Sequence, residues 1–203
     1  HACCVVATCL PTFAAIVLVA IVAIVGMIGF MGFGGGTTGL AIQQGTLAVT
    51  FAGSADIILT DAATSFGSGY VNASAGAAYI NSEGTSTNWI NTTAFPALDA
   101  MTLENNGSTL VNVTIVSDKN AATFIGGTGP AMWYKAANAE SSSCSGTLTN
   151  IYTTLDTSAS TLCTKFEYLD SKDTLTIHYN LTVPNDVLQG AKSATITVTS
   201  VAL

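Results

Sequence analysis

Charge is scarce in this chain of 203 residues, and its first part has none. Only 8% of the residues are charged, arginine is absent, and five lysines against 12 acidic residues leave a formal net charge of −7. Residues 2–55 contain no Lys, Arg, Asp or Glu. An acidic chain without arginine repels the phosphate backbone of nucleic acids, so we expect no nucleic-acid partner.

The sequence also lacks the short motifs of common catalytic and cofactor sites. It contains no HExxH, no P-loop, no nucleophile motif and no GxGxxG pattern between a strand and a helix. His178 falls in an alternating stretch beside apolar residues, where we expect an outward-facing polar position. Asp56 and Asp61 have no spacing that would define a calcium site. We therefore expect a protein that is not an enzyme and holds no metal or cofactor.

A long apolar run fills most of the charge-free region. Residues 3–33 are almost entirely apolar or glycine, and a helix of about 30 residues reaches roughly 45 Å, more than a bilayer core. Pro11 either kinks this helix or begins it. A track of small residues winds slowly around the helix, because its members are three positions apart: Ala20, Ala23, Gly26, Gly29 and Gly32. The track suits a helix with several close helical neighbours, although Ala and Gly are also common in membrane helices.

The rest of the chain reads as a joint followed by a β domain. Gly34, Gly35 and Gly36 open a stretch, residues 34–39, with the composition of a flexible hinge. From residue 40 onward, Thr, Val, Ile and Leu alternate at period two between Gly, Asn and Ser turns, which indicates half-buried antiparallel strands. The predicted fold is a long N-terminal hydrophobic α-helix over 1–33, the hinge, and an all-β, Ig-like β-sandwich head over 40–203.

Strands and loops can be assigned within the head. The plainest alternation covers residues 46–51, 109–116, 174–181 and 194–199. Asn106-Gly107 carries a strong turn signal and predicts a hairpin over residues 103–110. Two stretches without sustained alternation, 62–87 and 137–147, are expected to be long loops.

The five cysteines fall into two groups. Cys144 and Cys163 are the only cysteines of the polar part. If the domain is exported, we expect a disulfide between them, worth about 3 kcal/mol in the loop-entropy model, and the alternative is two buried thiols. Cys3, Cys4 and Cys9 lie in the apolar run, where cysteine packs as a small hydrophobic residue.

Five Asn-X-Ser/Thr sequons support export, and all lie in the polar part of the chain. Each alone is a weak signal in a sequence rich in Asn and Thr, but together they predict glycosylation of at least some of the set. The five acceptors are Asn72, Asn91, Asn106, Asn112 and Asn180. Asn106 is the best candidate, because it opens the predicted turn.

This order of parts resembles that of archaeal type IV pilins and archaellins. The resemblance rests on residues 1–33 as a core helix, 34–39 as a joint and 40–203 as a β-rich head. Bacterial pilins usually have an aromatic first residue and Glu at the fifth position, whereas this chain has His1 and Val5. The resemblance implies that a peptidase removes a short basic leader before His1, and that the segment rests in the membrane before it becomes the core of a filament.

Two functions from different classes follow from this layout. The first is a structural subunit of an extracellular, adhesive, helical filament of identical glycosylated subunits, polymerised through the N-terminal helix. The second is a monomeric cell-surface binding protein, held by one N-terminal transmembrane helix. The length of the apolar run and its lack of flanking charges favour the first.

Overall fold

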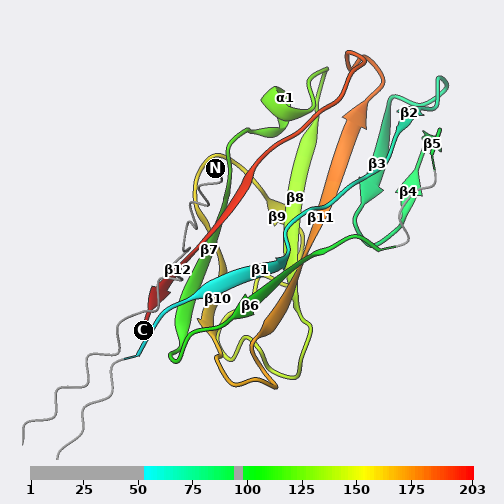
Figure 1. Ribbon diagram of the computed structural model, residues 1–203. Helices are drawn as coiled ribbons and strands as arrows, with labels where there is room; N and C mark the ends of the chain where they lie inside the picture. The colour runs from blue at the N-terminus through cyan, green and yellow to red at the C-terminus, as the bar shows by residue number, and fades with distance from the viewer. Residues whose placement is uncertain (1–52, 94–97) are drawn as a thin grey trace, which may run out of the picture. The chain divides into compact units, whose positions relative to one another are not determined.

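The computed structural model describes residues 53–93 and 98–203 (Figure 1). The predicted core helix, the 34–39 hinge and the predicted strand at 46–51 lie outside these residues. Gly53–Leu203 form a compact unit. Its described residues are mostly antiparallel β-sheet, as the Thr-rich alternation predicted.

Twelve strands and one short helix make up the described part of the chain. The helix, α1, is a single turn over Ala121–Phe124, and the Asn120 side chain caps it by accepting from the Thr123 N–H at 2.8 Å. In chain order the strands are β1 Ile57–Asp61, β2 Gly69–Val71, β3 Ala77–Asn81, β4 Ser86–Thr87, β5 Trp89–Asn91, β6 Met101–Asn105, β7 Val111–Ser117, β8 Ala131–Asn138, β9 Thr153–Thr154, β10 Ser160–Phe166, β11 Thr174–Pro184 and β12 Ile196–Ala202.

Strand β11 organises the larger, seven-stranded sheet. Strand β8 pairs with it along one edge, over Leu175–Thr182. The opposite edge is shared, with β6 on its first half and β3 on its second. Strands β1, β4 and β9 extend the sheet from β6, β3 and β8 respectively. A second sheet has the order β10-β7-β12, and β2 and β5 form a third.

One hydrophobic core draws on both larger sheets. The inward positions follow strict alternation, so that Val111, Val113 and Ile115 of β7 are fully buried while their neighbours are not. They belong to the same cluster as Leu103 of β6 and Ile177 of β11. Burial of each such side chain stabilises the fold by roughly 1.5–3 kcal/mol, which makes this cluster the main source of stability for the unit.

The predicted hairpin over residues 103–110 is wrong. Strand β6 pairs with β1 and β11, whereas β7 pairs with β10 and β12, so the connection crosses from one sheet to the other. The buried side chain of Asn105 shapes this crossing, because it donates to the Thr109 and Glu167 carbonyls and accepts from the Gly107 N–H. A Cβ on Gly107 would lie 2.2 Å from the Ser54 carbonyl oxygen, which explains the glycine.

The two predicted loops also contain regular structure. Residues 62–87 include β2, β3 and β4, and the core-facing Ala78 and Ile80 of β3 are buried. Residues 137–147 begin with the end of β8 at Asn138. These short strands were missed because two to five residues give too little alternation to detect.

Candidate functional site

Strands β8 and β11 carry polar and aromatic side chains on the face of their sheet that points away from the core. Their register aligns three pairs across the strands: His178 with Lys135, Asn180 with Trp133, and Thr182 with Ala131. On the other edge of β11, Tyr79 of β3 lies opposite Thr182. Cross-strand partners project to the same face. We call this surface the outer face, and it comprises Tyr79, Ala131, Trp133, Lys135, His178, Asn180 and Thr182.

An ion pair and an aromatic ring join three segments beside the outer face. The Lys135 ammonium lies 2.8 Å from Oε1 of Glu83, which follows β3, and 4.7 Å from the centre of the Tyr152 ring. The Tyr152 hydroxyl donates to Oε2 of Glu83 at 2.8 Å. The pair is part-exposed, so its contribution to stability is small. Its geometric effect is to connect β8, the β3–β4 turn and the chain before β9.

These contacts shift the pKa values of three groups. Partial burial raises the pKa of Glu83, but hydrogen bonds from Lys135 and Tyr152 outweigh it, and the net pKa lies below the ordinary value. Burial, together with the hydrogen bond to Glu83, raises the pKa of Tyr152. Burial lowers the pKa of His178, although the negative charge of Glu83 acts to raise it. At neutral pH the carboxylate is therefore ionised, while the phenol and the imidazole are neutral.

Three successive outward positions on β11 bury a polar atom without a hydrogen-bond partner. They are Nδ1 of His178, Oδ1 of Asn180 and Oγ1 of Thr182. The exposed fractions of His178 and Thr182 are only 8% and 7%. An unsatisfied buried polar atom costs roughly 1–3 kcal/mol. His178 thus lies on the outward side, as the alternation predicted, but it is buried there, which the alternation did not indicate.

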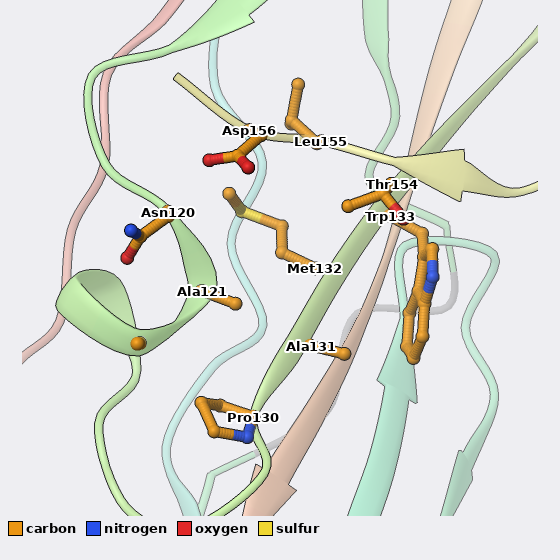
Figure 2. Close-up of a pocket in the computed structure, with 10 residues that line it drawn as sticks. Asn120, Ala121, Pro130, Ala131, Met132, Trp133, Thr154, Leu155 and Asp156 are labelled. Carbon is orange, nitrogen blue, oxygen red and sulfur yellow. The ribbon is translucent and has the colours of Figure 1, made fainter. Parts of the chain in front are cut away.

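A cavity of about 330 Å³ borders one end of the outer face. Figure 2 shows Asn120 and Asp156 on one side and Trp133 and Thr154 on the other, with Met132 between them. Adjacent residues of a strand project to opposite faces, so the Trp133 side chain lies on the outer face while the Met132 side chain belongs to the core, and the two do not face one another across the cavity. Sequence reasoning missed the cavity, since its walls come from α1, β8 and the chain around β9.

The predicted disulfide between Cys144 and Cys163 is present. It fixes the segment 143–149 beside β10, where backbone hydrogen bonds continue the contact. Four of these bonds run from Ser145 N to Lys165 O, Thr149 N to Leu162 O, Thr164 N to Thr147 O and Glu167 N to Ser143 O. The segment therefore covers the edge of β10 that β7 does not pair with.

The five sequon asparagines occupy two kinds of position. Asn91 and Asn106 are exposed, and Asn72 accepts from the N–H and hydroxyl of Ser74 in its own sequon. Asn112 and Asn180 lie within paired strands β7 and β11, and their Oδ1 atoms are buried without a partner. The first three are the better placed to carry a glycan.

Several predicted features lie outside the described residues. They are the small-residue track Ala20, Ala23, Gly26, Gly29 and Gly32, the hinge glycines Gly34, Gly35 and Gly36, and the cysteines Cys3, Cys4 and Cys9. Over residues 53–93 and 98–203, no helix is long and apolar enough to cross a membrane. The same residues hold no group of three or more His, Cys, Asp or Glu side chains suited to a metal ion.

Comparisons of this chain with protein-family models, with curated proteins and with solved structures found no match.

Proposed function

We propose that this protein is the structural subunit of an extracellular helical filament of the type IV pilus kind, with residues 1–33 as the core helix and an Ig-like β-sandwich head outside. The observation that carries the proposal is the contrast within one chain. Residues 2–55 have no charged side chain, whereas Gly53–Leu203 form a compact β unit around a core of their own.

The two parts require different surroundings. A β unit with its own core has no need of the apolar run, so that run must exclude water by contact with something else. Contact between copies of the run removes apolar area at roughly 25 cal/mol per Å², which amounts to tens of kcal/mol per subunit for about 20 large side chains before ordering costs. Repetition of one such contact by a non-closing rotation produces a fibre. The absence of charge fits this arrangement, because an unpaired ion in a dry bundle is costly.

Electron microscopy of material sheared from cells without detergent tests the proposal. We expect fibres that contain the full chain. Ile24→Asp should abolish them, because each subunit would bury a carboxylate in the core, whereas Ile24→Leu should leave them intact. Release of the chain only by detergent, as single molecules and without fibres, would instead support the monomeric protein held by one transmembrane helix.

The head is proposed to be glycosylated and held by its disulfide, as in an exported protein. We expect glycans at the exposed Asn91 and Asn106, and none at Asn112 or Asn180, whose amide oxygens are enclosed in paired strands. Mass spectrometry of peptides from the native protein measures this directly. Occupancy of Asn180 together with bare Asn106 would show that accessibility in the folded head does not select the sites.

A further inference from the structure

Most edges of the two larger sheets are protected against pairing with another chain. An open edge presents unpaired N–H and C=O groups, and natural sheets shorten it, bend it, charge it or cover it. Strand β1 has an irregular register between Leu59 and Asp61 and an acidic residue at its end. Strands β4 and β9 have only two residues each, and the segment 143–149, which the disulfide fixes, covers β10.

Strand β12 has none of these protective features. Its seven residues pair with β7 in one unbroken register, and the sequence ITVTSVA contains no charge, proline or glycine. Over residues 53–93 and 98–203, no strand pairs with its other edge. Four residues of β12 are exposed: Thr197, Thr199, Val201 and Ala202. This edge is therefore open to a further strand.

The distribution of charge favours a second copy of this chain as the partner. Copies of a chain with net charge −7 repel one another, so contact between them is least costly where acidic residues are absent. All 12 acidic residues lie between Asp56 and Asp186, and Lys192 is the only charged residue after Asp186. Strand β12 thus lies in the part of the head where two copies meet with the least repulsion.

We propose that β12 pairs with β12 of a second copy, antiparallel and about a two-fold axis. A register that pairs all seven residues of both strands places Thr199 opposite its own counterpart and Thr197 opposite Val201. These outward pairs consist of β-branched residues, which suit neighbouring strands, and no like charges meet. The second strand also covers the Val201 side chain, of which 68% is exposed. Each copy contributes the same surface, as in other two-fold interfaces.

In the proposed filament, this pairing joins the heads of neighbouring fibres and so bundles them. One pair of seven-residue strands is smaller than a stable specific interface, which buries roughly 1,200–2,000 Å², so each contact is weak. Many heads along two fibres engage at once, which raises the effective concentration for each further contact. Bundling rests on the proposed function, whereas the strand pairing concerns the head alone.

Cysteine cross-linking of the full chain tests the pairing and its register. The sample is sheared fibres, or the detergent-solubilised chain if no fibres form. Opposed residues of antiparallel strands have Cα atoms about 4.5–5.5 Å apart, within disulfide range. Under mild oxidation, Thr199→Cys should therefore give a peptide that links two copies of residue 199, detected by mass spectrometry. Identification of the peptide excludes links through the cysteines of the apolar run.

Thr197→Cys is the matched control, because it is exposed on the same face of the same strand. Its two copies lie about 14 Å apart in this register and cannot form a disulfide, so its yield should be at least about tenfold lower. A mixture of Thr197→Cys and Val201→Cys should link these two positions. Equal yields from Thr199→Cys and Thr197→Cys, or no link at residue 199, would overturn the proposal.

A charge on the edge tests the connection to bundling. Thr199→Lys places two ammonium groups opposite each other, so electron microscopy should show single fibres in place of bundles. Thr199→Val removes the same hydroxyl without a charge, and Thr153→Lys adds the charge to the exposed strand β9, so both should keep the bundles. Bundles that persist in Thr199→Lys would contradict the pairing as their cause. Absence of fibres from the wild-type chain would contradict the filament alone, and cross-linking then decides the pairing.

Amide hydrogen exchange separates a second copy from other occupants of the edge. Alternate N–H groups of an edge strand have no ladder partner and exchange rapidly. In the detergent-solubilised chain, we expect their protection in β12 to rise with protein concentration. Protection that is independent of concentration, without a link at residue 199, would show that another segment of the same chain, such as the predicted strand at 46–51, covers the edge, and the proposal would be wrong.

Discussion

Strands β11 and β12 have similar sequences and very different surroundings. Both alternate Thr with apolar residues, as TLTIHYNLTVP and ITVTSVA. β11 pairs along both edges, and from Ile177 to Pro184 only Asn180 is not buried. Among the described residues, β12 pairs only with β7, and its apolar Ile196 and Val198 are half-buried. Alternation therefore identifies a strand and its inward face, but not how many neighbours the strand has.

The sizes of the side chains do indicate that β11 is more enclosed than β12. β11 includes His178 and Tyr179, whereas no residue of β12 is larger than Ile196. The Tyr179 hydroxyl lies 3.1 Å from the Met101 sulfur inside the core, where a residue of the size found in β12 would leave a void. The lengths of the two strands differ in the same direction, since β11 has 11 residues and β12 has seven.

The largest predicted effect compares two isoleucines at inward positions of these strands. Ile177→Ala should lower the free energy of unfolding by about 2–5 kcal/mol, because the Ile177 side chain is fully buried and its loss leaves a cavity. Ile196→Ala should cost about 1 kcal/mol, because its site is half-exposed and can relax. Urea denaturation of the full chain measures both variants. Equal losses would mean that β12 is as enclosed as β11.

Much of the fold could be predicted from local pattern. The alternation over 174–181 and 194–199 gave β11 and β12 to within a few residues, and the Cys144–Cys163 pairing followed from the scarcity of other cysteines in the polar part. These predictions succeeded because a strand face and a disulfide partner are set by nearby residues and by elimination.

Long-range partners could not be predicted. Asn105-Asn106-Gly107 has the sequence of a hairpin, and only the pairing of β6 with β11 and of β7 with β10 shows that the chain changes sheets there. Likewise, nothing near Lys135 in the sequence indicates that Glu83 and Tyr152 meet it. The cavity was missed for the same reason, because its lining comes from α1, β8 and the chain around β9.

A second comparison concerns two threonine hydroxyls on the outward sides of β11 and β12. Thr182→Val should raise the free energy of unfolding by about 1 kcal/mol, because it removes a buried hydroxyl without a partner. Thr199→Val should lower it by about 0.5 kcal/mol, because the Thr199 hydroxyl lies 2.8 Å from that of Thr114. Thermal denaturation at constant pH detects the opposite signs.

Thr182 also completes the sequon of Asn180, so Asn180→Gln serves as the control for any lost glycan. This control should carry no glycan-related change in mass, in keeping with the enclosed position of Asn180. A loss of stability in Thr182→Val would show that the hydroxyl has a partner in solution, such as a bound water.

The last predicted effect is on the pH dependence of stability and concerns His178, which has no counterpart on β12. Burial lowers the pKa of its imidazole in the folded state, with Glu83 opposing and Lys135 adding to the shift. The unfolded chain, with an ordinary pKa near 6.5, then binds the proton more readily, so stability falls as the pH drops through about 6.5. The loss between pH 7.5 and 5.5 cannot exceed about 1.4 kcal/mol, the linkage of one proton over the pH unit below 6.5.

Urea denaturation at these two pH values, for the wild-type chain and His178→Gln, isolates this contribution. His1 and the carboxyl groups are common to both chains, and stopping at pH 5.5 keeps most carboxyl groups ionised. The variant should lose less stability than the wild type over this interval, because it has no imidazole to protonate at position 178. If the two chains lose the same amount, the outer face of β11 lets the imidazole ionise as freely as in the unfolded chain, and β11 is then no more enclosed on that side than β12.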